Sequence, residues 1–96
     1  MLDIRWEEGF EASLVQAVPD PEVRATLCER VEWVLACRAE AVSQAVPGTT
    51  CRLHHAGPIG VLPGVRILFR IEGDVVALIR AQRHASSLAS RLTAAA

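Results

Sequence analysis

Polar and hydrophobic residues alternate over residues 2–6, and this period of two predicts a short, half-buried strand. Residues 7–17 change to helical spacing, with Phe10 and Leu14 on one side. Two glutamates open this segment, where acidic side chains suit the positive end of a helix. We therefore expect a strand followed directly by a short helix.

A second, longer helix is predicted over residues 21–45. Asp20 is a good N-cap, and Pro21 suits the first helical position. The apolar residues of the segment follow helical spacing: Val23, Leu27, Val31, Leu35, Val42 and Ala45. The helix should stop before Val46-Pro47-Gly48, and its short link to the first helix predicts an antiparallel helical hairpin.

The remainder of the chain reads mainly as strands. Residues 51–55 form a short candidate strand, and the glycines and prolines of 56–64 indicate a loop. Residues 65–71 and 75–81 are apolar runs joined by a turn at Gly73-Asp74, which is typical of a β-hairpin. A short last helix is expected over residues 84–92.

This order of elements predicts one α+β domain over residues 1–96. The expected architecture is a small antiparallel sheet, in the order strand-helix-helix-strand-strand-strand, with the helical hairpin packed on one face and a short C-terminal helix. No internal repeat or long linker divides the chain.

The hairpin register places candidate chemistry on the open face of that sheet. With Gly73-Asp74 as a two-residue turn, Leu68 faces Ile79 and Ile67 faces Arg80. Arg66 then faces Ala81, and Arg83 lies diagonal to Arg66. Diagonal neighbours lie about 7–8 Å apart at the backbone, so both guanidinium groups could reach one phosphate. Solvated surface arginines are the competing interpretation of the same pattern.

Composition limits the possible functions. The 96 residues carry a net charge of −1, with ten Lys+Arg that are all arginine, and without tyrosine. Such a balance is not typical of a strongly basic nucleic-acid binder. No apolar run reaches the roughly 20 residues of a membrane span, and the acidic start differs from a signal peptide. We expect a cytoplasmic protein.

The cysteines and histidines indicate neither a disulfide framework nor a metal centre. Three widely spaced cysteines suggest reduced thiols. Cys51 and His54 have the spacing of one metal-ligand pair, but a second pair is missing. We expect no metal and no cofactor.

Trp33 lies outside the apolar stripe of the long helix, where it could pack against a loop or dock a partner helix.

The segment 63–84 resembles the RelE/ParE superfamily, the toxins of bacterial type II toxin–antitoxin pairs. Gly64, Arg66, Phe69 and Arg83 fill the places of a glycine, an arginine, an aromatic residue and a terminal arginine in that family, around the acidic turn 72–74. The order of elements resembles the family over nearly the whole chain.

The resemblance implies a toxin that a cognate antitoxin neutralises. RelE-like members cleave mRNA in the ribosomal A site, and the resemblance then implies Arg52, Arg66, Arg83 and His84 as catalytic candidates. Arginine would bind the phosphate, and His84 would be the best acid or base. Arg52 comes from the strand that often carries a basic residue in the family.

Three functions remain open at this point. The chain lacks the lysines and the tyrosine that RelE-like nucleases typically supply, which favours a ParE-like inhibitor of DNA gyrase as the alternative to an mRNA endoribonuclease. The third is a small, non-toxic interaction module of the same fold. A homodimer is compatible with each.

Overall fold

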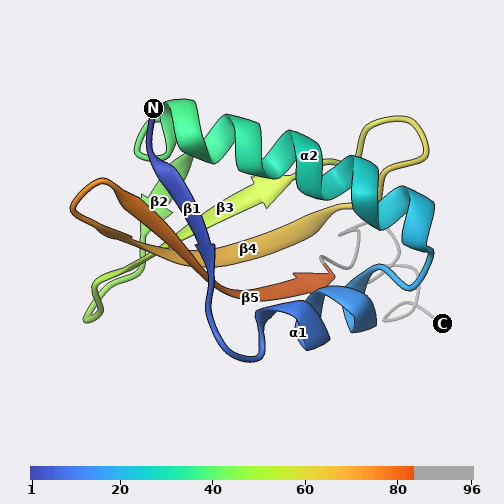
Figure 1. Cartoon of the computed structure of the whole chain (residues 1–96), viewed down its shortest axis with the longest axis horizontal. Helices are drawn as coiled ribbons and strands as arrows, with labels where there is room; N and C mark the ends of the chain where they lie inside the picture. Colours follow the sequence, from blue (N-terminus) through green and yellow to red (C-terminus); the bar gives the residue numbers. More distant parts are fainter. Residues whose placement is uncertain (84–96) are drawn as a thin grey trace, which may run out of the picture.

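The structure, a computed structural model, describes residues 1–83 and contains two helices and five strands in one sheet (Figure 1). The elements are β1 (Asp3–Trp6), α1 (Phe10–Ala17), α2 (Pro21–Arg38), β2 (Ser43–Ala45), β3 (Cys51–Ala56), β4 (Val65–Glu72) and β5 (Val75–Arg83). The strand order is β1-β5-β4-β3-β2. The helix predicted over residues 84–92 lies outside the described residues.

The sheet is mixed, so the prediction of an antiparallel sheet is wrong at one strand. β1 pairs with β5 in parallel, from Asp3 opposite Val75 to Trp6 opposite Leu78. The three other pairings are antiparallel, and those of β3 with β4 and of β4 with β5 join strands that the sequence predicted. Alternation within a strand reveals which side chains are buried, but it does not reveal the direction of a neighbour that is distant in sequence. Because β1 pairs with its first half, β5 is an interior strand there.

Both helices cover the same face of the sheet, as predicted (Figure 1). The carboxylate of Asp20 caps α2 by accepting hydrogen bonds from the backbone N–H of Glu22 at 2.9 Å and of Val23 at 3.2 Å. α1 starts later than predicted, because Gly9 adopts a left-handed conformation with φ of 86° before Phe10. Neither described helix is long and apolar enough to cross a membrane.

The long helix ends at Arg38 rather than at residue 45, and a short strand follows it. The Ser43 hydroxyl donates to the carbonyl of Ala39, and Ser43–Ala45 then pair with β3. Val42 and Ala45 have spacing that fits the apolar stripe of a helix, and so the sequence pattern did not distinguish the two structures. Pairing with β3 supplies the backbone hydrogen bonds that stabilise residues 43–45 as a strand rather than as a continuation of the helix.

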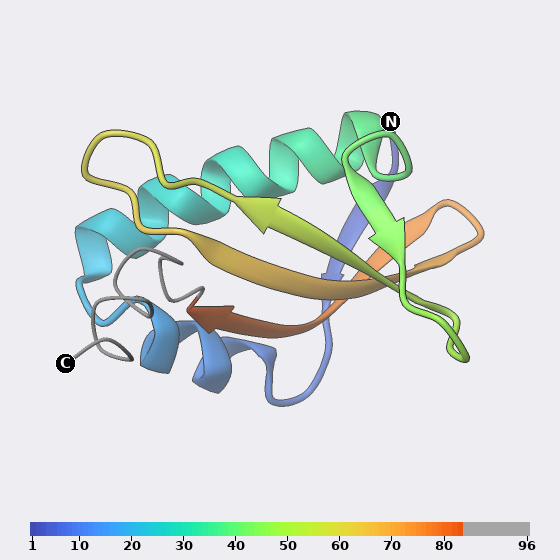
Figure 2. The same ribbon diagram turned by 180° about the vertical axis from the view of Figure 1, so that it is seen from behind.

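The core lies between the helices and β3, β4 and β5. Along β4, Val65, Ile67 and Phe69 point toward the helices and are at most 1% exposed. The largest fully buried partners come from the helices, the residue after α1 and β5: Phe10, Leu14, Val18, Leu35, Val76 and Leu78. The opposite face of the sheet is not covered by either helix (Figure 2), and we call it the open face.

The predicted two-residue turn is confirmed, but the register changes beyond it. Glu72 pairs with Val75, and the expected pairing holds as far as Phe69 opposite Leu78. A β-bulge then shifts the register by one residue, so that Leu68 pairs with Arg80 instead of Ile79. From there to the end of the hairpin, each pairing predicted for Arg66 and Ile67 is off by one.

The bulge keeps a charged side chain out of the core. Without the extra residue, Arg80 would lie opposite Ile67 on the face that the helices cover. Burying an unpaired guanidinium there would cost several kcal/mol. With the bulge, Ala81 takes the place opposite Ile67 and is 3% exposed, while Arg80 pairs with Leu68 on the open face.

Ser13 joins α1 to β5 directly after the bulge. Its hydroxyl donates to the carbonyl of Phe10 at 2.7 Å and accepts from the backbone N–H of Ala81 at 2.9 Å. One side chain therefore satisfies the shifted backbone at the point where the helix packs on the strand.

Ser13→Ala should lower the free energy of unfolding by about 1–3 kcal/mol, because the N–H of Ala81 loses its acceptor. Urea denaturation followed by circular dichroism measures the change. Thr26→Ala is the matched control, since the Thr26 hydroxyl donates to a helix carbonyl at an exposed position. Equal effects of the two substitutions would contradict the role given to Ser13.

Candidate functional site

The open face carries a hollow of about 240 Å³ with two arginines in its wall. Its lining residues come from the β2 end, β3, β4 and β5: Val46, Leu53, Arg66, Leu68, Arg80 and Gln82. Cations in a mostly apolar recess are less screened than cations on a flat surface, and so they attract an anion more strongly.

Arg66 and Arg80 are diagonal neighbours across the hairpin. Arg66 pairs with Gln82, and Arg80 lies two residues before Gln82 on the same face. The backbone separation of such neighbours is about 7–8 Å, and the two long side chains line the same hollow. The geometry that the sequence predicted for Arg83 is therefore met by Arg80.

Arg66 also has an unsatisfied donor. Its Nε is buried and has no hydrogen-bond partner among the described residues. Burying such a donor costs about 1–3 kcal/mol, so an acceptor brought in by a ligand would recover this energy. Among the predicted site residues, Arg66 is the one whose environment points most directly to an anionic ligand.

Arg83 lies beside the hollow rather than within it, so its predicted position diagonal to Arg66 is wrong. The bulge pairs Arg83 with Val65, whose side chain points toward the helices. Arg83 is exposed and lines a second hollow of about 250 Å³, next to Ser13 and Gln16 of α1. Arg80 and Gln82 line both hollows, so the two meet at the end of β5.

Arg52 faces away from the open face. It pairs with Phe69, on the face that the helices cover. Its Nε donates to the Ser43 hydroxyl at 2.7 Å, and Nη2 donates to the carbonyl oxygens of Ser43 at 3.2 Å and Glu40 at 3.4 Å. These bonds hold the turn between α2 and β2, so the structure places Arg52 in a supporting position, apart from Arg66.

His54 and His55 are consecutive in β3, so their side chains lie on opposite faces of the sheet. His55 pairs with Arg66 and shares the open face with it, whereas His54 pairs with Ile67 beneath α2 and is buried. His84, the predicted acid or base, lies outside the described residues. Within residues 1–83, His55 is thus the one imidazole on the same face as the arginine pair.

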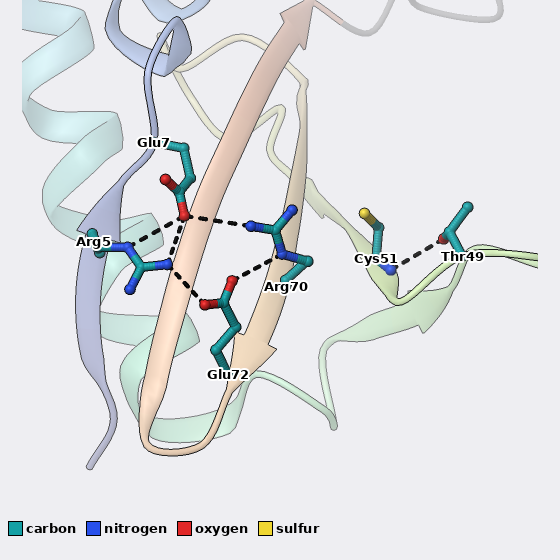
Figure 3. Close-up of polar contacts among 6 residues, drawn as sticks. All are labelled: Arg5, Glu7, Thr49, Cys51, Arg70 and Glu72. Atoms are coloured by element: carbon teal, nitrogen blue, oxygen red, sulfur yellow. Dashed lines mark hydrogen bonds and ion pairs between the residues drawn. The ribbon is translucent and has the colours of Figure 1, made fainter.

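Arg70 is also on the open face, but carboxylates already hold it (Figure 3). Its Nε donates to Glu72 at 2.9 Å, and Arg5 donates to Glu72 at 2.9 Å and to Glu7 at 2.6 Å. The small side chain of Ala77 lies between Arg5 and Arg70 in the sheet and leaves room for these ion pairs. This cluster occupies the turn end of the face and leaves Arg66 and Arg80 as the cations of the hollow.

Of the two roles that the sequence left open for Trp33, packing against a loop does not occur within residues 1–83. Its side chain is 62% exposed and lines a shallow groove between α2 and β1, with Leu2 and Ile4. The other tryptophan, Trp6, contacts Phe10 edge to face at 5.0 Å between ring centroids and donates to Glu32 at 3.0 Å.

The comparisons with known proteins show likeness in structure. No family model matches the chain, and no curated protein matches its sequence. The Mycobacterium tuberculosis toxin–antitoxin complex RelBE2 contains a chain with a TM-score of 0.70 and 16% identity, over 86% of this chain and 98% of that one.

Two further solved structures show the same likeness, one to a RelE toxin and one to a ParDE system. The isolated E. coli RelE toxin gives a TM-score of 0.65 and 14% identity, over 99% of this chain and 98% of that one. A chain of the chromosomal ParDE system of P. aeruginosa gives 0.61 and 16%, over 88% of this chain and 98% of that one. At these identities, the chain shares the fold of the RelE and ParE toxins.

The ion-pair cluster predicts an acid-dependent contribution to stability. Hydrogen bonds from Arg5 and then from Arg70 lower the pKa of Glu72 below its usual 4.5. A lowered carboxyl pKa stabilises the fold above the unfolded value, and this stabilisation is lost as the pH falls through the folded value. Glu72→Gln should therefore destabilise the protein near neutral pH and have little effect at pH values below the folded pKa of Glu72.

Urea denaturation at several pH values tests this expectation, and added salt should reduce the difference at neutral pH. Glu11→Gln, on α1, is the control for removing an acidic side chain outside the cluster. A loss on Glu72→Gln that is the same at every pH would show that the carboxylate charge is not its cause.

Proposed function

We propose that the chain is the toxin of a type II toxin–antitoxin pair and that it cleaves mRNA on the ribosome at the open-face hollow. The observation that carries this proposal is the pair Arg66 and Arg80 in one recess, with the Arg66 Nε left without an acceptor. The fold likeness to toxins solved in antitoxin complexes supports a cognate antitoxin as the partner.

The chemistry follows from a phosphodiester placed between the two guanidinium groups. The ribose 2′-oxygen attacks phosphorus, and the bond from phosphorus to the 5′-oxygen breaks, which yields a 2′,3′-cyclic phosphate and a 5′-hydroxyl. Arg66 and Arg80 would stabilise the charge that develops on the nonbridging oxygens. Arg83, at the neighbouring hollow, would bind the adjacent phosphate of the RNA.

Two protons must move in this reaction. One leaves the 2′-hydroxyl for a base, and one reaches the leaving 5′-oxygen from an acid. His55 lies next to Arg66 in the sheet register and is one candidate, while His84 follows Arg83 in the sequence and is the other. Imidazole is suited to either role because its ordinary pKa is close to neutrality.

A specific observation favours a second candidate, a ParE-like inhibitor of DNA gyrase. The hollow is lined by Val46, Leu53 and Leu68 as well as by its arginines, a mixture that also suits a protein surface. The chain has no lysine or tyrosine to add to the two histidines as proton carriers.

Loss of either arginine of the hollow should reduce toxicity. In an induced-expression assay, Arg66→Ala and Arg80→Ala should each weaken RNA cleavage by about 10- to 100-fold, the effect of losing a hydrogen bond to a charged group. Arg83→Ala should have a smaller effect. Arg38→Ala, an exposed substitution on α2, is the matched control. Unchanged toxicity in both hollow variants would overturn the site.

The two toxin activities leave different products in the same cells. Primer extension should show mRNA cut within translated codons when the wild-type chain is induced. Intact mRNA together with induction of the DNA-damage response would identify the gyrase inhibitor instead. Normal growth at good expression would contradict both activities and leave the non-toxic interaction module.

A further inference from the structure

Another recess, distinct from the two hollows of the open face, lies on the helix-covered side of the molecule, away from the arginine pair. It has a volume of about 180 Å³ and lies between α2, the end of β3 and the loop after it. Leu27, Val31, Val34, Ile59 and Leu62 give it apolar walls, and its charged or polar residues are Arg30, His54 and His55. Figure 1 shows the loop, in yellow, beside the first half of α2.

His54 presents a hydrogen-bond acceptor to this recess. Its Nδ1 lies 2.8 Å from the carbonyl oxygen of Val42, and a carbonyl only accepts, so Nδ1 carries the proton. In the neutral ring Nε2 is then a bare acceptor on the far side from Val42, and it has no hydrogen bond within the described residues. The His54 side chain is 8% exposed, so this acceptor is held in a fixed direction.

Arg30 supplies a free cation at the mouth of the recess. It is exposed and makes no ion pair with the described residues. The recess therefore combines apolar walls, one inward acceptor and one positive charge at its edge. Its occupant should combine an apolar body, a hydrogen-bond donor and a neighbouring negative charge.

The size of the recess selects between a small molecule and a side chain. Sites for drug-sized ligands have volumes of about 300–1,000 Å³, which is larger than this recess. Interface pockets, in contrast, commonly receive a single aromatic anchor. Tyrosine and tryptophan combine an apolar ring with an O–H or N–H donor at the tip. Such a donor would supply the hydrogen bond that Nε2 of His54 lacks within the described residues.

We propose that this recess docks one side chain of a protein partner, a tyrosine, the smaller of these two residues, that donates its hydroxyl to Nε2 of His54 and is followed by an acidic residue facing Arg30. The site is separate from the hollow of Arg66 and Arg80. Docking here needs no RNA cleavage, so this inference stands or falls independently of the proposed function.

Short peptides test the proposal on the intact chain by NMR. Acetyl-tyrosyl-glutamate amide should shift the signals of the His54 ring and the Val34 methyl groups. The phenylalanyl analogue lacks the hydroxyl and should bind about fivefold more weakly, the effect of one ordinary hydrogen bond. A tyrosyl-lysine analogue should also bind more weakly than the glutamate peptide.

Two variants assign these preferences to their residues. Arg30→Glu should reverse the preference for glutamate over lysine, whereas Arg38→Glu on the same helix should preserve it. His54→Phe should abolish the preference for tyrosine over phenylalanine. Because Arg30 is exposed, its variant keeps the test valid even where His54→Phe does not fold.

Three results would overturn the proposal. The first is equal affinity for the tyrosyl and phenylalanyl peptides. The second is a set of shifts around Trp33 in place of those around His54 and Val34. The third is an absence of shifts at peptide concentrations of several millimolar.

Discussion

The arrangement of the open face depends on one constraint, that the Arg80 guanidinium cannot be buried unpaired beneath α1 and α2. β5 must place Val76 and Leu78 in the core and also carry Arg80 two residues later, which simple alternation cannot do without burying the charge. The bulge resolves the conflict by inserting one residue, and Ala81 takes the buried place. Bulges next to functional sites commonly re-aim a side chain in this way.

The same shift explains why the fold was easier to predict than the site. The core positions of β4, the two helices on one face and the turn at Gly73-Asp74 follow from periodicity and local turn chemistry, and these predictions were correct. The parallel pairing of β1 and the strand β2 depend on partners distant in sequence, so local patterns did not contain them. A site built on register fails with an error of one residue, which moves Arg83 off the open face and makes Arg80 the arginine diagonal to Arg66.

A signal for this error was nevertheless present in the sequence. Extending the predicted register placed Arg80 directly opposite Ile67, a charged residue in an otherwise apolar layer. Local and global preferences that disagree in this way indicate either strain or an irregularity in the strand. Arg52 is a different case, because no local pattern set the register of its short strand against β4. Its side chain supports the turn after α2 through the Ser43 and Glu40 contacts.

The distribution of charge reconciles a net charge of −1 with the anion-binding role proposed for the open face. Glu7 and Glu72 form ion pairs with Arg5 and Arg70 at the turn end of the open face, so these acidic residues neutralise cations outside the hollow. Arg66 and Arg80 lack such partners in the described part of the chain and lie in a recess where screening is weaker. Attraction to a phosphate depends on this local field more than on the total charge. A nearly neutral chain can therefore hold a phosphodiester in this recess, even though its total charge adds little long-range attraction.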